Sequence, residues 1–188
     1  MALWRKIIVL IPAVIIAHLT AANIPLSMAQ GLQQVWELTP TQATWLSLSF
    51  VLGYILGWPI FYNTQAPKRD FLLGFMIAII ANLVFALGVD TNTSAFVFRF
   101  IAGFGVGMMV LPTVRFLDVK TGWATGLLLA ASWAISVPVC NYFSQGGILS
   151  LSGTQAGWLA VYTVAVLLGA LWWLISLVLL PRASKLAS

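Results

Sequence analysis

Arg99-Phe100-Ile101-Ala102-Gly103-Phe104-Gly105-Val106-Gly107 is the segment that decides the fold, and it lies inside a long apolar run. An arginine in hydrocarbon costs about 3 kcal/mol on insertion scales, so we expect Arg99 to face protein or a cavity and to have a partner there. The alternative is an arginine that extends along its helix to the outer interface. Glycines at alternate positions let neighbouring helices approach closely. The segment therefore predicts a tightly packed membrane helix with one costly charge near its start.

The composition indicates an integral membrane protein whose first partner is the lipid bilayer. Of the 188 residues, 61% are hydrophobic and only 7% are charged, whereas about 25% are charged in a soluble domain. The net charge of +5 has a use in setting membrane orientation, so it does not predict a nucleic-acid partner. We expect one domain, residues 1–188.

The reactive residue types are too few for most enzyme chemistry. Cys140 and His18 are the only residues of their kinds, so the sequence predicts no internal disulfide, no metal site and no cofactor. No nucleophile–base pair or phosphate-binding loop is visible, and the glycine run lies within a predicted helix rather than after a strand. An enzyme is therefore not expected.

Six apolar segments are long enough to span a membrane as helices. They cover residues 7–29, 44–62, 71–89, 95–116, 123–143 and 156–180. Lys and Arg occur in alternate connections: before the first helix, between the second and third, between the fourth and fifth, and after the sixth. By the positive-inside rule, this pattern predicts an all-α bundle in the inner (cytoplasmic) membrane with both termini in the cytoplasm.

Small residues recur at four-residue spacing, which places them on one helix face. Such rows let membrane helices pack at short range. The residues that we expect to serve helix packing are Gly103, Gly105, Gly107, Gly122, Gly126 and Pro138. The Trp172-Trp173 pair, near the end of the last helix, is typical of the aromatic belt at a membrane interface.

Polar residues at membrane depth are the candidates for a proton or substrate pathway. Besides Arg99 they are His18, Thr20 and Asn23 of the first helix. At 100° per residue, Thr20 and Asn23 share a face and His18 points away from it. The alternative for His18 is a neutral imidazole hydrogen-bonded to a neighbouring helix.

Together these features resemble the amino-terminal half of a major facilitator superfamily transporter, closest to the fourteen-helix multidrug:proton antiporter branch. Arg99-x-x-x-Gly103-x-Gly105-x-Gly107, followed by Pro112, is similar to the family's fourth-helix motif, in which the arginine is associated with proton coupling. His18-Leu19-Thr20-Ala21-Ala22-Asn23 resembles the branch's D-x-T-x-x-N, with histidine in place of aspartate. The family's loop motif is reduced to Lys68-Arg69, its fifth-helix motif to Val137-Pro138, and its second half is absent.

Two functions follow as hypotheses from this resemblance. In the first, the chain is a half-size transport module that works as a homodimer or heterodimer, because the halves of this superfamily are parallel repeats that can pair without inversion. In the second, it is a non-transporting subunit derived from such a transporter, which scaffolds a larger membrane protein complex. The partner is another half-transporter copy in the first case and other membrane subunits in the second.

Overall fold

The computed structural model is all-helical over the part of the chain that it describes. That part comprises residues 3–18, 38–60, 66–88, 92–117 and 154–180, with the single positions 130, 131, 134, 135 and 138. Its helices are α1 (Leu3–His18), α4 (Pro40–Ile60), α5 (Pro67–Gly88), α6 (Asn92–Leu117) and α8 (Thr154–Leu179). The all-α prediction is confirmed for these residues. The expected helix 123–143, like the second half of the expected helix 7–29, falls largely outside them.

The start of α4 shows why the predicted helix boundaries shift. The helix begins at Pro40 rather than at Thr44, because Thr39 caps it. The backbone N–H of Gln42 donates to Thr39 Oγ1 at 3.3 Å, and the backbone N–H of Thr39 donates to Gln42 Oε1 at 2.8 Å. This reciprocal capping box, with proline at the first helical position, extends the helix into a polar segment that the hydropathy pattern leaves outside the predicted helix.

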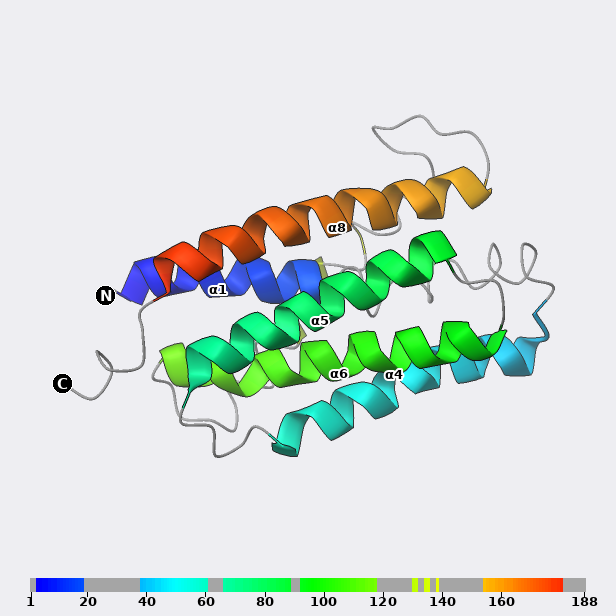
Figure 1. Ribbon diagram of the computed structural model, residues 1–188, viewed down its shortest axis with the longest axis horizontal. Helices are drawn as coiled ribbons and strands as arrows, with labels where there is room; N and C mark the ends of the chain where they lie inside the picture. Colours follow the sequence, from blue (N-terminus) through cyan, green and yellow to red (C-terminus); the bar gives the residue numbers. More distant parts are fainter. Residues whose placement is uncertain are drawn as a thin grey trace.

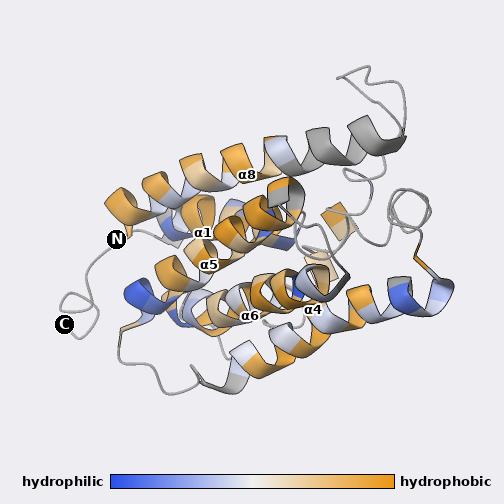
Figure 2. Cartoon of the chain, turned by 45° about the vertical axis from the view of Figure 1, so that its right-hand side comes forward, coloured by the Kyte–Doolittle hydropathy of each residue, from blue (hydrophilic) through white to orange (hydrophobic). Residues whose placement is uncertain are grey.

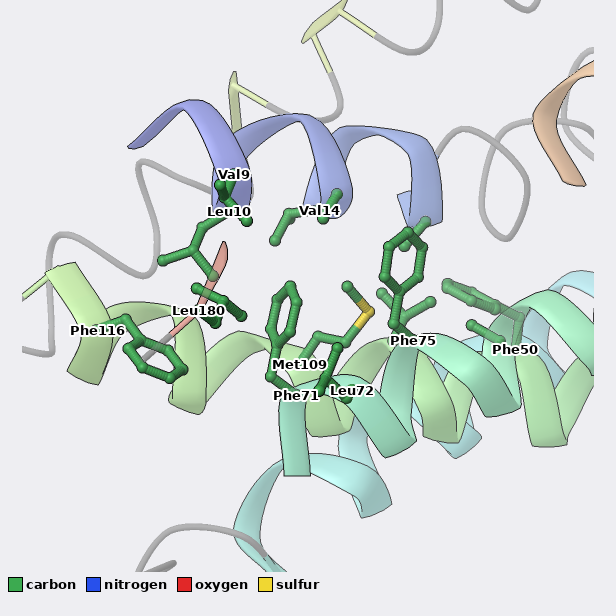
Figure 3. Close-up of a cluster of buried hydrophobic side chains, with 14 residues drawn as sticks. Val9, Leu10, Val14, Phe50, Phe71, Leu72, Phe75, Met109, Phe116 and Leu180 are labelled. Carbon is green, nitrogen blue, oxygen red and sulfur yellow. The ribbon is translucent and has the colours of Figure 1, made fainter. Parts of the chain in front are cut away.

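The helices form a layered bundle in which α6 is central (Figure 1). α4 packs on one side of α6 and α5 on another, while α1 and α8 lie together and cover α5. The chain runs one way in α1 and α5 and the opposite way in α4, α6 and α8. The main apolar core lies between α1, α5 and α6, where Leu10, Phe71 and Met109 meet (Figure 3).

Glycines hold α4, α5 and α6 at backbone contact. A methyl group on Gly53 would collide with the Phe100 carbonyl, and one on Gly103 would collide with the Phe50 carbonyl. The same exchange recurs one turn later between Gly57 and Gly107. Gly103 and Gly107 therefore face α4, as the four-residue spacing predicts.

Gly105 faces the opposite way, toward α5. A methyl group there would lie 2.6 Å from the Gly74 carbonyl oxygen and 2.7 Å from the Ala78 backbone nitrogen. The three alternate glycines thus let one helix pack closely against two neighbours at once.

The small-residue row of the expected fifth helix behaves differently. This row has small residues or proline at positions 122, 126, 130, 134 and 138, and its described members, Ala130, Ala134 and Pro138, are helical and exposed. That Pro138 serves helix packing stays a prediction. The four-residue spacing does place the three on one face, but that face points outward. Gly122 and Gly126 lie outside the described residues.

α8 is attached by side-chain hydrogen bonds instead of glycine contacts. Trp172 Nε1 donates to the Val9 carbonyl of α1, and Trp173 Nε1 donates to the Leu72 carbonyl of α5, each at 2.9 Å. The two tryptophans therefore point into the bundle and do not form the interfacial belt that their position suggested.

Lys68, at the start of α5, caps the C-terminal end of α8. Its Nζ donates to the carbonyls of Leu177 at 2.8 Å and Leu180 at 2.5 Å. A cation at a helix C-terminus satisfies orphan carbonyls and complements the helix dipole.

The outer surface of the bundle is strongly apolar (Figure 2). Large aliphatic and aromatic side chains are exposed along whole faces of two helices. On α4 they are Trp45, Leu48, Val51, Leu52, Ile55 and Leu56, and on α8 they are Leu167, Leu168, Leu171, Leu174, Leu177, Val178 and Leu179. Apolar surface of this extent marks contact with a membrane or a partner protein.

Within the described residues, one helix is both long and apolar enough to cross a membrane, Thr93–Phe116. Two shorter apolar helices, Lys6–His18 and Thr163–Leu179, fall below that length.

Candidate functional site

Arg99 is held inside the bundle by aromatic rings. Its side chain is buried, with 1% of the residue exposed, so it does not extend to the surface. The guanidinium carbon lies 5.1 Å from the ring centroid of Phe50 on α4 and 5.7 Å from that of Phe85 on α5. Desolvated cation–π contacts of this kind are worth about 2 kcal/mol, which partly offsets the cost of burying the charge.

His18 is the second buried ionisable residue, at the described end of α1. It is 1% exposed, and its Nδ1 lies 2.8 Å from the Val14 carbonyl oxygen of the same helix. A carbonyl oxygen only accepts, so Nδ1 carries the proton and Nε2 of the neutral ring is an acceptor.

Aromatic rings connect His18 to the surroundings of Arg99. The His18 ring meets the Tyr54 ring of α4 edge to face, with centroids 5.9 Å apart, and Tyr54 lies 6.1 Å from Phe50. The Phe50 ring in turn contacts the Arg99 guanidinium group. The histidine and the arginine therefore belong to one assembly that crosses from α1 through α4 to α6.

Asn82 of α5 lies at the same depth as these residues. On α5 it stands between Ala78, which adjoins Gly105, and Phe85, which adjoins Arg99. Gly169 of α8 approaches both Ile79 and Ile16, so α1 and α5 are in register and His18 lies near the level of Asn82. We call His18, Tyr54, Asn82 and Arg99 the buried polar layer.

Leaving Arg99 aside, three polar atoms of this layer make no hydrogen bond among the described residues. They are His18 Nε2, Tyr54 Oη and Asn82 Oδ1. The Asn82 amide nitrogen donates to the Ala78 carbonyl of its own helix at 2.8 Å, not to a neighbouring helix. Unsatisfied buried polar atoms are rare in native proteins and call for an explanation such as a bound molecule or a functional role.

The structure describes only two of the four predicted site residues. The structure brings Arg99 and His18 into the same layer, while Thr20 and Asn23 lie outside the described residues. Tyr54 was not predicted. The available signal was a hydroxyl-bearing ring between Gly53 and Gly57, inside an otherwise apolar stretch.

The layer has groups for binding but no group of metal ligands. In the described ranges, no three His, Cys, Asp or Glu side chains come together to hold a metal ion. What the layer offers is a fixed cation, an imidazole acceptor, a phenol donor and an amide. These groups suit the binding of a polar solute.

No protein-family model matches this chain, and no curated protein matches it significantly.

Proposed function

We propose that the chain is a half-size membrane transport module of the major facilitator type, which works as a homodimer or heterodimer in the inner membrane. The observation that carries the proposal is the buried polar layer, in which an arginine is held on the glycine-packed helix of the bundle. A bundle that needed only stability would place an apolar side chain there, because a buried charge is costly even when its neighbours compensate it.

The arrangement of the helices supports a six-span reading of the chain. The end of α6 and the start of α8 lie at opposite ends of the bundle (Figure 1), so residues 118–153 connect one end to the other. This is what the predicted helix 123–143 would do. Up-and-down helices with apolar outer faces are the arrangement that a bilayer requires.

The distribution of charge supports the proposed orientation. Lys6 belongs to the start of α1, Lys68 and Arg69 to the start of α5, and Arg115 to the end of α6, and these three helix ends lie toward the same end of the bundle (Figure 1). Arg99 is the one Lys or Arg side chain that is buried among the described residues. By the positive-inside rule, that shared end is cytoplasmic.

Flux through purified protein tests the proposal. We expect proteoliposomes that contain only this chain to move at least one of three probes, ethidium, carboxyfluorescein or labelled mannitol, faster than empty liposomes. Arg99→Ala should lower that flux at least tenfold, as expected for the loss of an interaction of about 1.4 kcal/mol or more. Arg115→Ala, which changes an exposed arginine, is the matched control. Flux of every probe at the level of empty liposomes, or flux indifferent to Arg99, would contradict transport.

The second candidate function, a scaffolding subunit of a larger membrane complex, is favoured by the outward-facing small residues. Ala130, Ala134 and Pro138 are exposed, and small residues of this kind let a foreign helix pack closely. Purification from native membranes in mild detergent separates the two functions. Recovery of the chain with itself alone supports the transport module, and stoichiometric recovery of other subunits supports the scaffold.

A further inference from the structure

Two of the unsatisfied atoms in the buried polar layer belong to neighbouring rings on different helices. His18 Nε2 comes from α1 and Tyr54 Oη from α4, and both atoms are buried with no hydrogen bond among the described residues. Their rings are in contact, with centroids 5.9 Å apart. Burying such atoms without a hydrogen bond is unfavourable, so the pair gains free energy from any molecule that completes both bonds.

The chemistry of the pair selects the kind of molecule. Nε2 accepts a hydrogen bond, because Nδ1 donates to Val14, and the Tyr54 hydroxyl donates one. A solute hydroxyl group donates to the first atom and accepts from the second. A carboxylate cannot donate to Nε2, and an ammonium cannot accept from Tyr54. Either charged group would also lose its hydration among the rings of His18, Tyr54 and Phe50.

α1, which carries His18, is held by side-chain contacts and not by glycine-to-backbone contacts. α4 is fixed to α6 by the glycine contacts at Gly53 and Gly57. α1 instead bonds to α8 through Trp172, and it meets α4 through the His18 and Tyr54 rings. Displacement of α1 with α8 would therefore open the space between these rings and keep the glycine contacts of α4 with α6, at the expense of the Trp173 bond to α5 and part of the apolar core.

We propose that His18 and Tyr54 form a two-point hydrogen-bonding site for a neutral solute that carries a hydroxyl group. The inference rests on the proposed function, since it names the class of solute that the buried polar layer binds. It predicts binding that can be measured on the purified chain without any transport assay.

The first test asks whether the Tyr54 hydroxyl is unsatisfied in the empty protein. Tyr54→Phe removes that hydroxyl and keeps the ring. We expect the thermal unfolding midpoint in detergent to stay the same or rise. The matched control is Thr113→Val, which removes a buried hydroxyl that donates to the Met109 carbonyl at 2.7 Å and should lower the midpoint. A midpoint lowered as much by Tyr54→Phe as by Thr113→Val would overturn the proposal.

The second test compares four probes of one shape by ligand-observed NMR: benzyl alcohol, benzyl methyl ether, toluene and benzylammonium. We expect benzyl alcohol to bind most tightly, and we expect Tyr54→Phe or His18→Phe to weaken it about tenfold, which corresponds to one hydrogen bond of about 1.4 kcal/mol. Thr113→Val should leave all four affinities unchanged, and toluene should be insensitive to every variant.

Equal binding of benzyl alcohol and toluene would mean that the pair holds water only, and it would overturn the proposal. Tighter binding of benzylammonium would overturn the solute class. Binding as predicted but without flux in proteoliposomes would leave the site standing and contradict transport. Flux in proteoliposomes without a preference for benzyl alcohol at this pair would support transport and contradict the hydroxyl site.

Discussion

The two sides of this bundle are held together by different means. α4, α5 and α6 meet at backbone contact, because glycines stand wherever a side chain would separate them. α1 and α8 are joined to each other by the Trp172 hydrogen bond, and they meet the rest through side chains: the Trp173 hydrogen bond, the Lys68 cap and the apolar core. In the membrane setting that we propose, hydrophobic drive for helix association is small, so packing and interhelical hydrogen bonds must supply it.

This difference teaches where the molecule tolerates change. A glycine contact with a backbone carbonyl has no side chain that can rotate out of the way, so an added methyl group can be accommodated only if a helix moves. A side-chain contact can adjust by a rotamer or by a small helix shift. The buried polar layer lies where the two kinds of packing meet, with Arg99 on the glycine side and His18 on the other.

The largest expected difference in stability is between two glycine-to-alanine substitutions, one on each side of the bundle. In Gly103→Ala the new methyl group collides with the Phe50 carbonyl, and we expect unfolding to become easier by about 3 kcal/mol, the upper range for overpacking. In Gly169→Ala the methyl group meets the Ile79 side chain at 3.1 Å, which can give way, so we expect a change of less than about 1 kcal/mol. Unfolding of both variants by SDS titration in mixed micelles measures the difference. Equal losses would remove the distinction between the two sides.

A smaller effect is expected from the indole hydrogen bonds of α8. Trp172→Phe and Trp173→Phe each remove one donor and keep an aromatic ring, so each should cost about 1 kcal/mol. Hydrogen exchange should accelerate in α8 and leave α6 unchanged. Trp45→Phe, at a position that is 55% exposed, is the control and should change nothing. Faster exchange in α6 would show that the two sides do not open separately.

The Lys68 cap should contribute slightly less, because it lies partly in solvent. Lys68→Met keeps most of the side-chain length and removes the donor to Leu177 and Leu180, and we expect a loss of about 0.5–1 kcal/mol confined to the last turn of α8. Arg69→Met removes a side chain that is 69% exposed and that bonds the buried Asp70 carboxylate at 2.9 Å, but it leaves the α8 carbonyls capped, so hydrogen exchange in the last turn of α8 should not change. Equal acceleration of that exchange in Arg69→Met and Lys68→Met would argue for general charge at this end and against a specific cap.

Much of the glycine side could be predicted from the sequence, because a missing side chain is visible there. The spacing of Gly103, Gly105 and Gly107 predicted close packing, and all three are in contact with neighbouring helices. Which neighbour each one meets depends on helix register, which no local pattern specifies. The same spacing at Ala130 and Ala134 marks an exposed face.

The residues of the candidate site that could be predicted are those whose side chains are unfavourable inside an apolar helix. Arg99 and His18 stand out because a charge or an imidazole inside an apolar run needs a reason. Tyr54 does not stand out, since a tyrosine is ordinary until its hydroxyl is found buried and unsatisfied. Likewise Trp172 and Trp173 suggest an interface by position, yet they donate to carbonyls of α1 and α5. Each of these misses depends on the arrangement of the helices.

The smallest expected effect on stability sharpens the contrast between two rows of small residues. Ala134 is exposed, so the larger side chain of Ala134→Leu has room on the solvent or lipid side, and we expect a change within about 0.5 kcal/mol. If the row is where a partner helix packs, the same variant should weaken self-association or the recovery of other subunits, because leucine holds the helices apart. Unfolding and sedimentation in mild detergent, made on the same samples, measure both quantities. A loss of stability near that of Gly103→Ala would mean that the row packs inside the chain, and unchanged stability with unchanged association would mean that it faces lipid alone.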